Sequence, residues 1–200
     1  MNYYFFMNSP LGLLKVITTD SALTGIEFSD QVDEIGAGIH GAVDEICPTY
    51  DLKGDVVSLV NEENLTVMPS DAAKKVLPLK VASIAEQFEN ELTAYFSGTL
   101  REFKVPFVVE TGTEFQKKVW QALLTIPYGN TISYGELAQS LGLSLGASRA
   151  VGAACGANPL PILIPCHRVV AAHGWPGGYS GGLWRKERLL QREGVRAYPL

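Results

Sequence analysis

The organisation of the chain is clearest in residues 133–157, which read SYGELAQSLGLSLGASRAVGAACGA. Ser133 is followed three residues later by Glu136, a capping box that predicts a helix over 133–141. A turn with glycine and serine comes next, and a second helix is expected over 147–157. Two short helices joined by a tight turn are the outline of a helix-turn-helix.

The second of these helices consists almost entirely of alanine, glycine and serine. Small side chains let a helix approach either a packed neighbour or a nucleic-acid groove, and packing is the commoner reason. Arg149 lies in the first turn, where positive charge opposes the helix dipole. We therefore expect Arg149 to point outward, toward phosphate or into a base stack.

A rigid segment follows the helix-turn-helix. Asn158-Pro159 ends the second helix, and the apolar run of residues 160–165 contains prolines at 161 and 165. This pattern predicts a buried, strand-like segment. It leads directly to Cys166, whose neighbours His167 and Arg168 create an electropositive setting that favours the thiolate.

Cys166 is the candidate nucleophile, whereas a buried and inert thiol suits Cys155. Neighbours along a chain point in different directions, so we expect a water between Cys166 and His167 rather than a direct hydrogen bond. His167 also needs an orienting carboxylate. Glu193 ends a helix expected over 183–193, where the dipole disfavours a carboxylate, which indicates another duty for it.

The rest of the chain predicts a sheet followed by helices. Three β-prone segments open it, and residues 56–60 are a further candidate strand within a stretch, 30–70, to which we assign no function. Apolar spacing predicts a helix from Leu79 that stops at Gly98. The capping box at Thr113 starts another helix, with Phe115, Val119, Trp120 and Leu123 on its apolar face. The β-prone segments are 3–7, 13–19 and 23–28.

Charge divides the chain at the same place as this pattern. Residues 1–111 carry 7 Lys/Arg and 17 Asp/Glu, and residues 112–200 carry 9 Lys/Arg and 4 Asp/Glu. A basic half beside an acidic half is typical of a phosphate-facing module with an acidic partner domain. No apolar run approaches the ~20 residues of a membrane span, and the amino terminus lacks signal-peptide features. We expect a cytoplasmic protein, nuclear in a eukaryote, without a membrane partner.

The residues around Cys166 resemble one family, the O6-alkylguanine-DNA alkyltransferases. The resemblance is specific over residues 112–194, looser over 1–30 and 79–107, and does not extend to 30–70. It rests on motifs in family order: Ile132-Ser133-Tyr134, Arg149-Ala150-Val151-Gly152, Asn158-Pro159, Pro165-Cys166-His167-Arg168-Val169, Tyr179-Ser180-Gly181-Gly182-Leu183, Lys186-Glu187, Leu189-Leu190 and Glu193-Gly194.

The resemblance implies stoichiometric, irreversible transfer of an alkyl group from O6-alkylguanine, and from O4-alkylthymine, to Cys166. His167 would take the thiol proton through a water, and Glu193 would orient His167. Tyr134 would donate a hydrogen bond to N3 of the flipped guanine, and Arg149 would replace the extruded base. Asn158 would be the hinge after the recognition helix. The remaining implied substrate contacts are Val169, Tyr179 and Ser180.

The resemblance also implies a two-domain α/β fold. Residues 1–111 would form a ribonuclease-H-like antiparallel sheet with helices, and residues 112–200 a mainly helical domain with the helix-turn-helix. The expected partner is double-stranded DNA bound through its minor groove by a monomer. Some family members bind zinc in the amino-terminal domain, but His40 and Cys47 have no second pair of ligands nearby, so we expect no metal and no cofactor.

Three other functions fit parts of this pattern. A damage-binding relative would recognise alkylguanine without repairing it, but such proteins lack the acceptor cysteine. A cysteine hydrolase with Cys166, His167 and Glu193 as its triad would turn over many times. A DNA-binding regulator would bind a specific sequence and show no dependence on the thiol.

Overall fold

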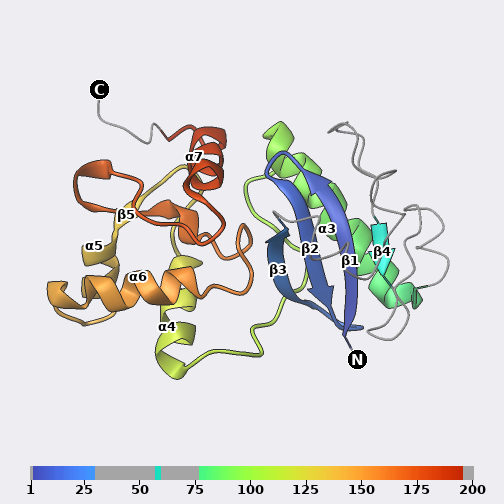
Figure 1. Ribbon diagram of the computed structural model, residues 1–200, viewed down its shortest axis with the longest axis horizontal. Helices are drawn as coiled ribbons and strands as arrows, with labels where there is room; N and C mark the ends of the chain where they lie inside the picture. Colours follow the sequence, from blue (N-terminus) through green and yellow to red (C-terminus); the bar gives the residue numbers. More distant parts are fainter. Residues whose placement is uncertain (1, 30–56, 60–76, 196–200) are drawn as a thin grey trace. The chain divides into compact units, whose positions relative to one another are not determined.

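The computed structural model describes residues 2–29, 57–59 and 77–195 and divides the chain into two compact units (Figure 1). The first unit comprises Met1–Thr93 with Val105–Val108, and the second comprises Ala94–Lys104 with Val109–Leu200. The boundary expected between residues 111 and 112 stays a prediction. None of the described helices is long and apolar enough to cross a membrane.

The first unit contains an antiparallel sheet with the strand order β3-β2-β1-β4. The predicted meander is confirmed to within two residues at each strand end, and the candidate strand at 56–60 is β4. The tight turn between β1 and β2 is held by Ser9, whose Oγ accepts from Leu11 N at 3.1 Å and donates to Gly12 O at 2.7 Å. The strands are β1 (Tyr3–Ser9), β2 (Gly12–Thr18), β3 (Leu23–Ser29) and β4 (Val57–Leu59).

Helix α3 (Leu79–Ser97) is the long helix predicted from the apolar spacing. The buried side chains of its residues 79–93 belong to the core of the first unit, to which the strands also contribute large apolar side chains, whereas its last turn belongs to the second unit. The helix stops at Gly98, which has φ of +88° and therefore a conformation that glycine adopts without strain. The core includes Phe5, Leu14, Val16, Val81, Phe88 and Leu92.

The second unit is mainly helical, as predicted. Both capping boxes are present. The side chains of Thr113 and Ser133 each accept a hydrogen bond from the backbone N–H of the third helical residue, and the side chain of that residue accepts one from the backbone N–H of the capping residue. Phe115 is an exception to the predicted apolar face, since it is 36% exposed. The helices are α4 (Glu114–Leu123), α5 (Tyr134–Ser140), α6 (Ser148–Gly156) and α7 (Leu183–Arg192).

Helices α5 and α6 contact each other and form the predicted helix-turn-helix. Helix α4 packs against α6, where the indole Nε1 of Trp120 donates to Ala154 O at 2.8 Å. Trp120 also covers Gly112, whose φ is +95° and where a Cβ atom would lie 2.5 Å from the indole ring. Trp120 on α4 therefore contacts both α6 and Gly112, the residue before the N-cap of α4.

The segment at residues 160–165 is buried but is not a strand, so that prediction is wrong. Ile162 has φ of +77°, and the chain turns back so that Ile164 N donates to Leu160 O at 2.9 Å. The side chain of Asn158 replaces strand pairing, because it accepts from Leu160 N at 3.0 Å and donates to Ile164 O at 2.8 Å. The result is a tight turn that positions Cys166.

A short parallel pairing was not predicted. Strand β5 (Ile132–Ser133) lies beside β6 (Val169–Val170) and joins the start of the helix-turn-helix to the residues after Cys166. This pairing connects the start of α5 with the segment that carries the cysteine.

The capping box of α4 gives a stability prediction. Replacing Thr113 by alanine removes the acceptor for Gln116 N, and we expect the free energy of unfolding to fall by about 1 kcal/mol in a urea titration. The control is Thr111→Ala, two residues earlier and exposed, for which we expect less than about 0.5 kcal/mol. Equal losses in the two variants would contradict this role of the cap.

Candidate active site

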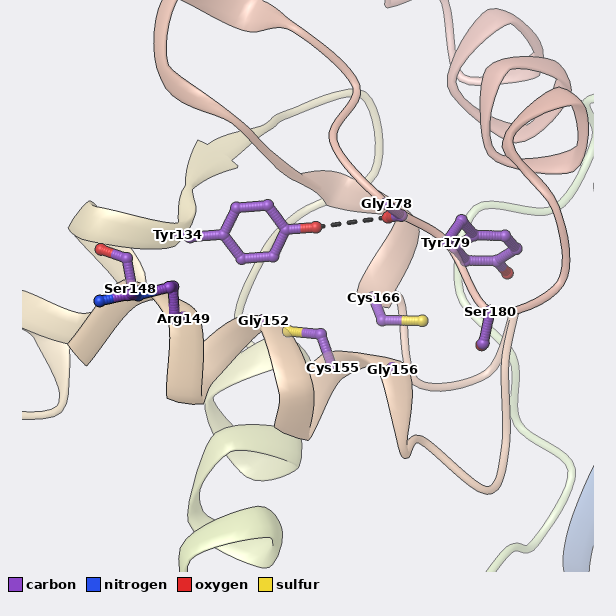
Figure 2. A pocket seen from close by; sticks show the side chains of 10 residues that line it. All are labelled: Tyr134, Ser148, Arg149, Gly152, Cys155, Gly156, Cys166, Gly178, Tyr179 and Ser180. Carbon is purple, nitrogen blue, oxygen red and sulfur yellow. Dashed lines mark hydrogen bonds between the residues drawn. The ribbon is translucent and has the colours of Figure 1, made fainter. Parts of the chain in front are cut away.

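Cys166 begins a short 3₁₀ turn (Cys166–Arg168) at the wall of a cavity of about 440 Å³ (Figure 2). The cysteine is 4% exposed, and its Sγ accepts a hydrogen bond from Asn158 Nδ2 at 3.1 Å. The cavity is lined by Tyr134, Ser148, Arg149, Gly152, Cys155, Gly156, Cys166, Gly178, Tyr179 and Ser180. Residues from α5, from α6 and from the glycine-rich loop before α7 therefore meet around one thiol.

Cys166 does not lie in the electropositive setting that its neighbours predict. Burial raises the pKa of its thiol above the ordinary value, and the Asn158 hydrogen bond and the charge of Lys186 offset only part of this. The guanidinium of Arg168 faces away, donating to Ile126 O at 2.6 Å and to Glu193. The thiol is protonated at neutral pH, so its use as a nucleophile requires a base.

Glu193 accepts hydrogen bonds from four residues in three separate segments of the chain. Its Oε1 accepts from Tyr95 Oη at 2.8 Å, from His167 Nε2 at 2.9 Å and from Arg168 Nη2 at 2.9 Å. Its Oε2 accepts from Gly129 N at 2.9 Å and from Arg168 Nε at 2.9 Å. Burial would raise the pKa of this carboxyl, but the hydrogen bonds from His167 and Arg168 outweigh it and lower the pKa to about 2.

His167 is fully buried and neutral at pH 7. Burial lowers the pKa of its imidazole below 6.5, although the contact with Glu193 opposes this. The ionised carboxylate of Glu193 can only accept hydrogen bonds, so Nε2 of His167 must carry the imidazole proton. Nδ1 is then the basic nitrogen, and it makes no hydrogen bond to any part of the chain that the structure describes. As expected, no direct hydrogen bond joins His167 to Cys166 within the described residues.

Tyr134 begins α5 and reaches across the cavity. Its Oη donates to Gly178 O at 3.3 Å, as Figure 2 shows. Burial, with the nearby Cys155 and Cys166 thiols, raises the pKa of the phenol to about 12. The group therefore stays protonated at neutral pH and remains a hydrogen-bond donor.

Helix α6 presents its small residues to the cavity as well as to the core. Gly152 and Gly156 line the cavity, and Val151 and Ala154 are buried. The buried face agrees with the packing explanation, whereas approach of the helix to a nucleic-acid groove stays a prediction. Arg149 lines the same cavity, and its expected direction toward phosphate or a base stack stays a prediction.

Cys155 is also a cavity residue, although the sequence indicated only an inert buried thiol. Its side chain is 5% exposed and reaches the same cavity as Cys166. Its place one turn after Gly152 on α6 was the available signal, because residues three apart share a helix face.

Lys186 lies beside the cysteine, although the sequence analysis named it only within a motif. It is fully buried, and its Nζ donates to Val169 O at 2.5 Å and to Gly178 O at 3.2 Å. Burial lowers the pKa of its ammonium to about 8. The signal was its position on the apolar face of α7, three and four residues before Leu189 and Leu190.

The predicted substrate contacts fall into two groups. Tyr179 and Ser180 line the cavity. Asn158 and Val169 do not line it. Asn158 donates a hydrogen bond to Cys166 Sγ, and Val169 is fully buried. The structure thus brings most of the expected residues to one place, while their individual roles stay predictions.

The candidate metal ligands His40 and Cys47 lie outside the described residues. In residues 2–29, 57–59 and 77–195, no three side chains of His, Cys, Asp or Glu are grouped to hold a metal ion.

Two family models match the chain. Residues 2–109 match the ribonuclease-like domain of 6-O-methylguanine DNA methyltransferase, and residues 114–195 match its DNA binding domain. A methylated-DNA–protein-cysteine methyltransferase of Mycolicibacterium paratuberculosis is 40% identical over 190 residues, covering 95% of this chain and 91% of the relative. One of Mycobacterium bovis is 55% identical over 108 residues, and that match spans 54% of this chain and 64% of the relative.

Solved structures agree with this match. The O6-methylguanine methyltransferase of Mycobacterium tuberculosis superposes with a TM-score of 0.67 at 37% identity, covering 96% of this chain and 93% of that one. The M. tuberculosis OGT in complex with DNA gives a TM-score of 0.66 at 36% identity, with coverages of 98% and 94%. The expected two-domain fold, with an antiparallel sheet followed by a helical domain, is confirmed. By these matches over both halves, the chain belongs to the 6-O-methylguanine DNA methyltransferase family.

Proposed function

We propose that this protein repairs O6-alkylguanine in DNA by transferring the alkyl group irreversibly to Sγ of Cys166. The observation that carries the proposal is the thiol at the wall of a cavity, with a neutral imidazole and a buried carboxylate beside it. Family membership supports the same chemistry, because relatives are named for transfer from methylated DNA to a protein cysteine.

The reaction forms an Sγ–C bond and breaks the bond between the alkyl carbon and O6 of guanine. The thiol proton passes to Nδ1 of His167 through a water. The guanine leaves as its anion and takes up one proton from water, and His167 returns the thiol proton to water. Glu193 stabilises the imidazolium that forms, as the ionised partner of Nε2. The product is a thioether, which no residue at this site hydrolyses, so each molecule acts once.

Guanine inside a duplex is out of reach of a buried thiol, so the nucleotide must leave the stack, at a cost of a few kcal/mol. Helix α6 is suited to enter the minor groove, because its small residues allow close approach. Arg149 would occupy the space of the extruded base. O4-alkylthymine presents a similar alkyl–oxygen bond and is a second proposed substrate.

Tyr134 would assist departure of the guanine. Its phenol stays protonated, since its pKa is about 12, and it can exchange Gly178 O for N3 of the flipped base. A hydrogen bond to the base makes guanine a better leaving group. Tyr179 and Ser180 would line the pocket around the base and the alkyl group, with Val169 behind them.

The proposed partner is double-stranded DNA, and a solved relative is described in complex with DNA. The monomeric state, the cytoplasmic location and the domain boundary at residues 111 and 112 stay predictions. The cysteine hydrolase is the alternative that shares these residues, and it differs by repeated turnover.

Intact-protein mass spectrometry tests the transfer. After mixing with excess duplex containing one O6-methylguanine, we expect a mass gain of one CH₂ per protein, mapped to Cys166. The Cys166→Ala variant should gain nothing, and Cys155→Ala, which alters the second thiol of the cavity, should still gain one. Tight binding to the damaged duplex without any mass gain would leave a recognition protein and overturn the proposal.

The pH dependence of methyl transfer in a single turnover tests the base. The pKa of His167 lies below 6.5, so the imidazole is neutral and ready to accept a proton at every higher pH. Burial holds the pKa of Cys166 above 9.0. We therefore expect a rate constant that is level between about pH 7 and 9 and falls in acid. A rate that rises tenfold per pH unit from 7 to 9 would instead indicate attack by a free thiolate without a base.

A further inference from the structure

Tyr95 places a buried hydroxyl against the candidate active site from the last turn of α3. The residue is 1% exposed, belongs to the second compact unit, and donates from Oη to Glu193 Oε1 at 2.8 Å. Three rings enclose it, with centroids 5.2, 5.3 and 6.0 Å from its own, and they belong to Phe96, Phe103 and Tyr128. A polar group in such an apolar enclosure is retained where its hydrogen bond has a use.

The oxygen that accepts from Tyr95 is the one that accepts from His167. Both bonds end on Oε1 of Glu193, whereas Gly129 N reaches only Oε2. Arg168 Nη2 also donates to Oε1, at 2.9 Å, so Tyr95, His167 and Arg168 share the charge of one carboxylate oxygen. The proposed mechanism above uses Glu193 and His167 and leaves Tyr95 without a role.

Tyr95 is protonated, and therefore a hydrogen-bond donor, at neutral pH. Burial, and then the charge of Glu193, raise the pKa of its phenol far above the ordinary value. The hydroxyl cannot ionise, and the carboxylate is the acceptor that faces it. The bond is charge-assisted, the stronger class of hydrogen bond.

We propose that Tyr95 is a positioning residue for alkyl transfer that acts through Glu193, because its hydroxyl takes up part of the charge on the oxygen that also bonds His167. The inference rests on the proposed function only in assigning His167 as the base. By sharing Oε1, Tyr95 limits how strongly the carboxylate stabilises the imidazolium. His167 then stays neutral until the thiol proton arrives.

The direction of the effect follows from the groups around His167. Glu193 is the anionic partner of the His167 imidazole, and Arg168 and Lys186 are the nearby cations. Cys166 is the preceding residue in the chain. Without the Tyr95 hydroxyl, Arg168 and Gly129 still hold the carboxylate in place. More of the charge on Oε1 then acts on His167 Nε2, so the imidazolium is favoured and the pKa of His167 rises.

The surroundings of Tyr95 supply a matched control. Tyr128 is its neighbour in the same ring cluster, but its Oη donates to Arg192 O at 2.9 Å rather than to Glu193. Arg101 lies over the Tyr128 ring, 5.7 Å from its centroid, and Arg192 Nε donates to Tyr95 O at 3.0 Å. Tyr128→Phe thus removes one hydroxyl from the same cluster without touching the carboxylate.

The test is an NMR titration of the histidine rings in the full-length protein, which has 3 histidines. The signals of His40 and His173 are assigned with glutamine variants at those positions. We expect Tyr95→Phe to raise the pKa of His167 by about 0.5 to 1 unit, and Tyr128→Phe to leave it unchanged. The acid limb of the single-turnover methyl-transfer profile should move to higher pH by the same amount, with the level rate above it changed by less than about threefold.

Three outcomes separate the claims. A pKa of His167 that is unchanged in Tyr95→Phe, or that moves equally in Tyr128→Phe, overturns the role of Tyr95. A fall of that pKa overturns it as well, because the hydroxyl would then only support the geometry of Glu193. Absence of methyl transfer by the unaltered protein would overturn the proposed function, and the NMR titration would still decide the coupling between Tyr95 and His167.

Discussion

The second unit is organised around one buried negative charge, the carboxylate of Glu193. Its two oxygens accept from the end of α3, from the loop after α4, from the turn that begins at Cys166, and the carboxylate itself follows α7. Removing a carboxylate from water costs several kcal/mol, and attraction to a cation repays this only when the remaining lone pairs are also satisfied. Here the guanidinium of Arg168 supplies the charge, and a hydroxyl, an imidazole and a backbone amide supply the rest.

This arrangement determines the state of the thiol. Arg168 and His167 both turn toward Glu193, so the residues beside Cys166 provide no free positive charge. The thiol stays protonated in its buried position, where Asn158 bonds its Sγ and Lys186 is the nearby cation that lowers its pKa. A protonated thiol is a weak nucleophile and needs a base to take its proton, which is the role proposed for His167.

Much of this could be predicted from the sequence, because it depends on local rules. Capping boxes at Thr113 and Ser133 defined two helix starts, and the dipole argument indicated that Glu193 had another duty. The hydrogen bonds of Glu193 with Arg168 and with Tyr95, 25 and 98 residues away in the chain, were not predicted, because neither a local pattern nor the resemblance pointed to them. Residues 160–165 were assigned to a strand because periodicity cannot register the side-chain hydrogen bonds of Asn158 that close them into a turn.

The central claim is that Glu193 holds His167 as the neutral tautomer with its proton on Nε2, so that Nδ1 is the base. Long-range ¹H–¹⁵N correlation spectra of the free protein at pH 7 test it directly. We predict the shift of a protonated nitrogen for Nε2 and of an unprotonated nitrogen for Nδ1, with the two signals converging in Glu193→Gln. A proton on Nδ1 would leave unprotonated only Nε2, the nitrogen that faces Glu193, and an imidazolium at pH 7 would leave no basic nitrogen; either result would contradict the account.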